Sequence, residues 1–74
     1  MENLKKVVSA NISRLRVLNK LTQSELGEKL NYSDKAVSKW ERGESVPDVM
    51  TLAQIAELFG IGVNELINQT DAVA

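Results

Sequence analysis

The sequence predicts an all-α fold, a compact bundle of five helices, and three observations support this prediction. Apolar residues recur at helical spacing in five segments. Serine, threonine and aspartate stand where several segments begin, and glycine or asparagine stands where several end. No segment alternates apolar and polar residues as a half-buried strand does, and no internal repeat is present. Seventy-four residues make one small domain with one modest core. We place this domain at residues 1–70, followed by a frayed tail at 71–74.

The first two helices are defined by a long apolar stripe and by a capping sequence. The stripe recurs at spacings of four and three residues and consists of Leu4, Val8, Ile12, Leu15 and Leu18. Lys20 and Leu21 end that helix. The "TQSE" of residues 22–25 has the form of a capping box, so a second helix begins there and runs to about Leu30. Gly27 costs about 1 kcal/mol relative to alanine in mid-helix, and we therefore expect a neighbouring helix to approach it closely.

A tight turn joins the second helix to a third. Asparagine tolerates the left-handed conformation better than most residues, so Asn31 and Tyr32 make the turn. Ser33 caps the start of the third helix and Gly43 ends it. A helix, a three-residue turn and a second helix, with a small residue at the crossing, form the helix-turn-helix pattern.

Two further helices follow the loop "ESVPD". Asp48 caps the fourth helix, whose apolar residues at i, i+3, i+4 and i+7 are Leu52, Ile55, Ala56 and Phe59. Gly60 ends it, and residues 63–67 form a last short helix. The inward-facing residues of the second, third and fourth helices are expected to share one core; they are Leu26, Leu30, Val37, Trp40, Leu52, Ile55 and Phe59.

Charge is divided unevenly along the chain. The net charge is −1, but all nine lysine and arginine residues fall in residues 1–44, which carry +3 once their acids are counted. Residues 45–74 hold four acids and no base, and so carry −4. Screening confines a charge's effect to about 10 Å at ordinary salt. A locally basic surface can therefore meet phosphates although the chain as a whole is slightly acidic.

Several classes of function are disfavoured by what the sequence lacks. Without cysteine or histidine it has neither disulfides nor the usual ligands of a zinc site. It also has no glycine-rich phosphate loop and no carboxylate pair beside a nucleophile, so we predict no enzyme, no catalytic or metal-binding residue and no cofactor. No signal segment and no apolar run near 18 residues is present, so a cytoplasmic protein is expected, with no membrane contact for this segment.

Five fragments together resemble a known family. They are "LTQSELGEKL", "SDKAVSKWERG", the proline loop, "TLAQIAELFG" and "NELI", and in this order and spacing they are similar to the XRE/Cro-like helix-turn-helix domains of phage repressors and bacterial regulators. The match runs from about Ile12 to Ile67; Gly27, Asn31 and Gly62 depart from the usual residues. The resemblance implies a lambda repressor-like fold. It also implies a sequence-specific transcriptional regulator, more often a repressor, that binds a two-fold operator in double-stranded DNA as a homodimer.

By this resemblance, residues 33–42 are the recognition helix and lie in the major groove. Helical spacing places one set of side chains on a shared side, away from Val37 and Trp40; this set, our predicted base contacts, is Asp34, Lys35, Ser38 and Lys39. Lysine donates to guanine, serine bonds most bases and aspartate accepts from cytosine. For Asp34, a role at the positive end of the helix dipole is an equal alternative. Trp40 is expected in the core, because base stacking uses several aromatic residues.

The predicted phosphate contacts lie around the recognition helix. Thr22 and Gln23 stand at a helix start, where free N–H groups suit an anion. Arg42 is a phosphate clamp or a cation at a helix end. Asn31 and Ser45 are lesser candidates, for which a structural role is favoured over a contact with DNA. The resemblance further implies that Arg16 and Glu41 form a structural pair that ties the first helix to the recognition helix.

One alternative function stays open at the level of sequence. Antitoxins and adaptors of the same family hold a partner protein, and the acidic C-terminal third suits that use. Phosphate binding weakens steeply with salt, which separates the two. The abrupt "DAVA" end suggests a fragment of a longer protein.

Overall fold

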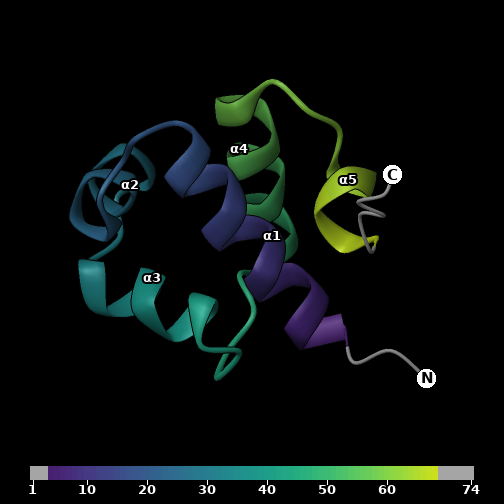
Figure 1. Ribbon diagram of the computed structural model, residues 1–74, viewed down its shortest axis with the longest axis horizontal. Coiled ribbons are helices and arrows are strands. Elements are labelled where there is room, and N and C mark those ends of the chain that lie inside the picture. The colour runs from purple at the N-terminus through teal and green to yellow at the C-terminus, as the bar shows by residue number, and fades with distance from the viewer. Residues whose placement is uncertain (1–3, 69–74) are drawn as a thin grey trace.

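The computed structural model describes residues 4–68, which form five helices in the predicted order (Figure 1). They are α1 (Leu4–Leu18), α2 (Gln23–Leu30), α3 (Asp34–Glu41), α4 (Val49–Phe59) and α5 (Val63–Ile67). The predicted all-α fold is confirmed. The predicted tail at 71–74 lies outside the described residues.

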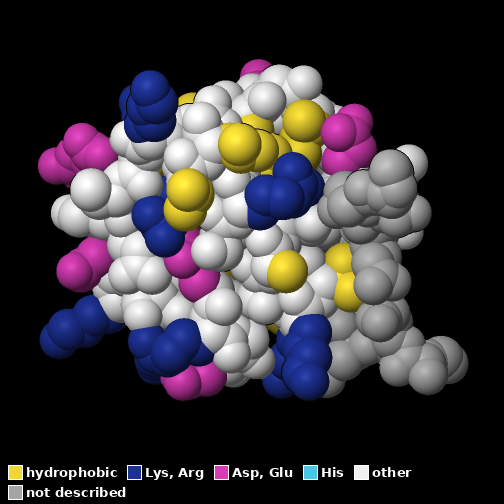
Figure 2. Space-filling model, viewed as in Figure 1, with side chains coloured by type: hydrophobic (Ala, Val, Ile, Leu, Met, Phe, Trp, Pro, Cys, Tyr) yellow, Lys and Arg dark blue, Asp and Glu magenta, His cyan; other side chains and the backbone are white. Residues whose placement is uncertain are grey.

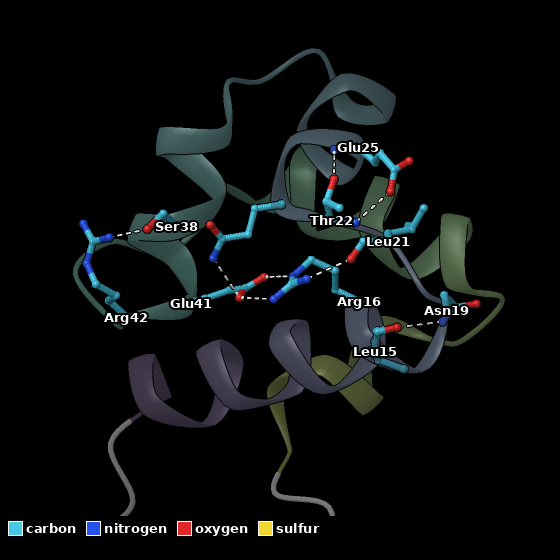
Figure 3. A network of polar contacts seen from close by, with 10 residues as sticks. Leu15, Arg16, Asn19, Leu21, Thr22, Glu25, Ser38, Glu41 and Arg42 are labelled. Atoms are coloured by element: carbon cyan, nitrogen blue, oxygen red, sulfur yellow. Dashed lines mark hydrogen bonds and ion pairs between the residues drawn. The ribbon is translucent and has the colours of Figure 1, made fainter.

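Three helices begin at the predicted capping residues. Thr22 accepts a hydrogen bond from the Glu25 N–H at 3.0 Å, and the Glu25 carboxylate accepts one from the Thr22 N–H at 2.8 Å, which completes the capping box (Figure 3). Ser33 caps α3 and Asp48 caps α4. In each of these caps the side chain accepts one hydrogen bond from a backbone N–H of the first turn. Each cap satisfies a backbone N–H that has no partner inside the helix.

The helix ends use left-handed residues, as predicted for Asn31 and Gly60, whose φ angles are 64° and 70°. Gly43 also has a positive φ, 75°, immediately after α3. The sequence did not predict that Lys20 has a φ of 58° at the end of α1. There the Leu21 N–H reaches back to the Arg16 carbonyl at 3.1 Å, which stabilises a turn that a lysine adopts less readily than a glycine.

The helices pack around α1, which runs through the middle of the molecule with α3 and α5 against it (Figure 1). The α2–α3 pair packs most extensively, and α4 contacts α2 and α5. All five helices contribute to one buried cluster; its members are Val8, Ile12, Leu15, Leu26, Leu30, Val37, Trp40, Leu52, Ile55, Ala56 and Leu66. Six of the seven predicted core residues belong to this cluster, and Phe59 packs against it partly buried.

The ends of α1 differ from the prediction. Leu4 and Leu18 are 55% and 66% exposed, so only the three middle members of the apolar stripe reach the core. Helical spacing gives a direction for each side chain, but a turn at a helix end is buried only if another element covers it.

Gly27 is buried, but its close neighbour is not the crossing helix that was expected. A Cβ built there would lie 2.6 Å from the Tyr32 carbonyl oxygen and 3.0 Å from that of Ser33. The backbone of the turn between α2 and α3 therefore occupies the space of a side chain, and the missing methyl group lets α3 start close to α2.

Candidate nucleic-acid interface

The α3 helix has a buried face and an exposed face. Val37 and Trp40 are 0% and 5% exposed, whereas Asp34, Lys35 and Lys39 are exposed. Ser38, the fourth predicted base contact, is half-buried. Along the lower edge of the molecule, over α3 and the N-terminal end of α1, Figure 2 shows lysine and arginine side chains with acidic ones between them. The cations of α3 thus belong to an edge of mixed charge.

Trp40 is held in the core by a second aromatic residue. Its ring meets Tyr32 edge-on, with ring centroids 5.0 Å apart, and the Tyr32 hydroxyl lies 3.0 Å from the Thr51 hydroxyl. These contacts fix α3 and the turn before it against α4. Trp40 is therefore a packing residue, as predicted.

Arg16 and Glu41 pair through two hydrogen bonds, as the resemblance implied. Arg16 Nε donates to Glu41 Oε2 at 2.6 Å and Nη2 donates to Oε1 at 3.0 Å, while Nη1 donates to the Leu21 carbonyl at 2.8 Å (Figure 3). The side chains are 17% and 7% exposed. The hydrogen bonds that Arg16 donates to Glu41, more than the charge of Glu41, raise the pKa of Arg16 above its ordinary value against the opposing effect of burial. This pair links α1 to the end of α3 and to the loop before α2.

Gln23 joins this pair through a contact that the sequence did not indicate. Its Nε2 donates to Glu41 Oε1 at 3.1 Å, so the Glu41 carboxylate holds residues from α1 and α2 together. Gln23 is half-buried at the start of α2, next to the exposed cap Thr22. The two predicted phosphate contacts at this helix start therefore lie where the N-terminus of α2 meets the end of α3.

Arg42 ends α3 and is bound on both sides. Its Nη1 donates to the Ser38 hydroxyl, Nε donates to Glu44 Oε2 at 2.7 Å and Nη2 donates to Glu44 Oε1 at 3.1 Å. Glu44 was not among the residues predicted from the sequence, although its position across the Gly43 turn from Arg42 was a usable signal. Ser45, the weakest candidate, is half-buried in the loop that follows.

The α3 helix, with its exposed lysines on one face and its buried face packed against a second helix across a tight turn, defines the class of the protein, a helix-turn-helix domain. The chain belongs to the helix-turn-helix family, whose model matches residues 12–66. It is 36% identical to an uncharacterised transcriptional regulator of this type, y4dJ, from Sinorhizobium fredii, over 93% of this chain and 90% of that protein.

Two other similar proteins differ in their named roles. The transcriptional activator BcrR of Enterococcus faecalis is 34% identical over 84% of this chain, which spans only 30% of that protein. The P22 c2 repressor, solved in complex with a synthetic operator, superposes with a TM-score of 0.79 and 25% identity over 85% of this chain and 96% of that one. The family thus assigns the chain to the DNA-binding transcriptional regulators, but these two named roles do not agree on whether transcription is raised or lowered.

Among residues 4–68, every helix is too short or too polar to cross a lipid bilayer.

Proposed function

We propose that this chain binds specific sequences in double-stranded DNA, with α3 in the major groove. The observation that carries the proposal is the division of α3, whose buried face is fixed by Val37 and Trp40 while Lys35 and Lys39 extend outward. In this orientation the two lysines donate to guanine O6 and N7, and Ser38 bonds a base edge. Asp34 accepts from a cytosine amino group or stays at the helix start to favour the dipole.

The phosphate contacts follow from the elements around α3. The first N–H groups of α2 have no acceptor inside the helix, and only that of Glu25 is satisfied by Thr22. An amide nitrogen carries two hydrogens, so Gln23 can donate one to Glu41 and the other to a phosphate oxygen. Arg42, and more weakly Ser45, extend this contact along the DNA backbone. The Arg16–Glu41 pair, to which Gln23 is also bonded, fixes the start of α2, with its phosphate contacts, relative to α3, with its base contacts.

We further propose a homodimer on a two-fold operator and repression as the outcome. One eight-residue helix reaches only a few base pairs, and two copies on half-sites about one helical turn apart double the sequence that is read. A protein bound over a promoter blocks transcription without further contacts, so DNA binding alone suffices for repression. The acidic C-terminal third of the chain is the part that we propose for binding a protein partner.

The direct test is selection of binding sites from random duplex DNA. We expect an enriched inverted repeat, and a reporter gene carrying it should be less active when the protein is present. Enrichment of a single half-site would refute the dimer, and a more active reporter would refute repression.

Substitutions then separate the proposed roles on the selected site. Lys35→Ala and Lys39→Ala should weaken specific binding by about 1–3 kcal/mol and change non-specific binding much less. Gln23→Ala and Arg42→Ala should weaken both alike, because phosphates carry no sequence information. An equal loss of specificity from all four changes would contradict this division.

Salt dependence separates DNA binding from the alternative of a protein-interaction module. Each phosphate contact adds about 0.9 to the slope of log affinity against log salt concentration. We expect a slope of several units on duplex DNA. If no duplex binds at low salt while a partner protein binds with little response to salt, the chain is an interaction module instead.

A further inference from the structure

The turn after α3 places an acid beside the predicted phosphate contact. Gly43, with a φ of 75°, reverses the chain so that the Gly43 N–H donates to the Trp40 carbonyl at 3.1 Å and the Glu44 N–H to the Lys39 carbonyl at 2.9 Å. These two backbone bonds fix where the Glu44 side chain begins. The acid is therefore held at the end of α3 by the fold and does not depend on a flexible loop.

From that position Glu44 engages the Arg42 guanidinium edge-on. Two donors, Nε and Nη2, point to the two oxygens of one carboxylate at 2.7 and 3.1 Å, while Nη1 points to Ser38. Both charged side chains are 53% exposed, so the pair forms at the surface. A bidentate pair is the geometry in which arginine also binds a phosphate. The carboxylate thus occupies the Nε–Nη2 edge of the guanidinium, one of the edges at which a DNA phosphate could bind with two hydrogen bonds.

Charge acts in the same direction as geometry. Hydrogen bonding from Arg42, followed by the charges of Arg42 and Lys39, lowers the pKa of Glu44, so the acid stays ionised near two cations of the proposed interface. An ionised carboxylate repels a phosphate that approaches either cation. In the unbound protein, Glu44 therefore weakens the attraction of this end of α3 for any DNA backbone.

We propose that Glu44 restrains DNA binding by competing with phosphate for Arg42. It is a positioning residue, because its carboxylate must be displaced from Arg42 before a phosphate can take its place. This competition applies to specific and non-specific DNA alike, because phosphates carry no sequence information. This inference rests on the proposed function, since it needs Arg42 to meet a phosphate.

The test compares variants in which one carboxylate is replaced by a neutral amide. Their affinity for a random-sequence duplex is measured over a range of salt concentrations. Glu44→Gln keeps the side-chain length and should tighten binding about three- to tenfold at low salt, with a salt slope steeper by up to about 0.9. Glu57→Gln is the matched control, because Glu57 is exposed on α4 and lies beside Lys29 and Leu30 of α2, away from the Arg42–Glu44 pair. It should change the affinity less than about twofold, as expected for a remote charge under screening.

A second background tests whether Glu44 acts through Arg42. If it does, Glu44→Gln should bring no gain when combined with Arg42→Gln, whereas a general effect of charge would persist there. The role of Glu44 would be refuted by a gain in affinity in both backgrounds. It would also be refuted if the wild-type protein binds DNA and Glu44→Gln changes the affinity no more than Glu57→Gln does. Neither result would refute the proposed function. Absence of binding by wild type and all variants would overturn the proposed function, and this inference with it.

Discussion

At the scale of single residues, the cap that Asp48 forms at the start of α4 makes the stability of the fold depend on pH. Its Oδ1 accepts from the Thr51 N–H at 2.8 Å. Hydrogen bonds from the backbone and then the side chain of Thr51 lower the pKa of Asp48 below its ordinary value. A carboxyl group whose pKa is lowered by folding stabilises the fold above its unfolded pKa, and this stabilisation is lost as the pH falls through the lowered value.

We predict that Asp48→Asn makes the stability less sensitive to acid. Asparagine caps a helix about as well as aspartate but does not titrate. The free energy of unfolding, measured with urea at a series of pH values below the ordinary aspartate pKa, should fall more steeply in wild type than in the variant. Asp48→Ala, which lacks the cap at every pH, should differ from Asp48→Asn by a constant amount. Parallel curves for wild type and Asp48→Asn would exclude a pKa lowered by folding.

Arg16 and Glu41 provide a second prediction at this scale. Because both side chains are largely shielded from water and share two hydrogen bonds, a double-mutant cycle with alanine should give a coupling energy above about 1 kcal/mol, more than an exposed pair usually gives. The exposed pair Arg42 and Glu44 is the internal comparison and should couple more weakly. Additive effects of Arg16→Ala and Glu41→Ala would show that the pair contributes nothing specific.

At the scale of elements, α5 is attached by a side chain from α1. Asn11 is 3% exposed, and its Nδ2 points to the carbonyls of Glu65, Leu66 and Asn68 at 3.2, 2.8 and 3.1 Å. The last carbonyls of a helix have no partner inside it, and α5 has only five residues. Asn11 thus satisfies the C-terminal end of α5, while Leu66 supplies its buried apolar contact.

We predict that Asn11→Ala lowers the free energy of unfolding by about 1–3 kcal/mol, because it removes the donor to the buried Leu66 carbonyl. Urea unfolding measures the loss, and hydrogen exchange should increase first in α5. Asn19→Ala is the matched control; its side chain donates to the Leu15 carbonyl at 2.7 Å, but Asn19 is exposed and water can replace it. Equal losses in the two variants would contradict a special role for Asn11.

At the scale of the whole molecule, one core holds all five helices together. Ile55 is fully buried and Leu52 is 9% exposed, and both face the other helices from α4. Replacing such residues by alanine removes apolar contacts and leaves a cavity. A domain of this size has little stability to lose.

We predict that Leu52→Ala and Ile55→Ala each cost about 2–5 kcal/mol, which is a large part of the stability of a small domain. Thermal unfolding followed by circular dichroism should show a large fall in the melting temperature. Leu58→Ala, on the same helix but 38% exposed, should cost much less. A melting temperature within a degree of wild type for either core variant would contradict the packing of α4.

Most of the local structure and the division of α3 were predictable from the sequence alone. The caps at Thr22, Ser33 and Asp48 and the left-handed turn at Asn31 depend on residues three or four apart, so the spacing of residue types determines them. The same spacing separated Val37 and Trp40 from the lysines of α3. The pairing of Arg16 with Glu41 came only from the family resemblance, because nothing local relates two residues on different helices.

Only the tertiary structure decided which side chains meet across helices. The tertiary structure alone shows that Gln23 bonds to Glu41, and that Asn11 bonds to α5 more than 50 positions further along the chain. It also shows that Leu4 and Leu18 are exposed, at the two ends of an apolar stripe whose members looked alike in the sequence. The physical reason is that periodicity gives the direction of a side chain from its own helix, whereas its partner and its burial depend on how the helices pack. The proposed interface joins the two levels: its cations were visible in the sequence and the contact of Ser38 with Arg42 is local, while helix packing set the contact that holds Gln23 to Glu41.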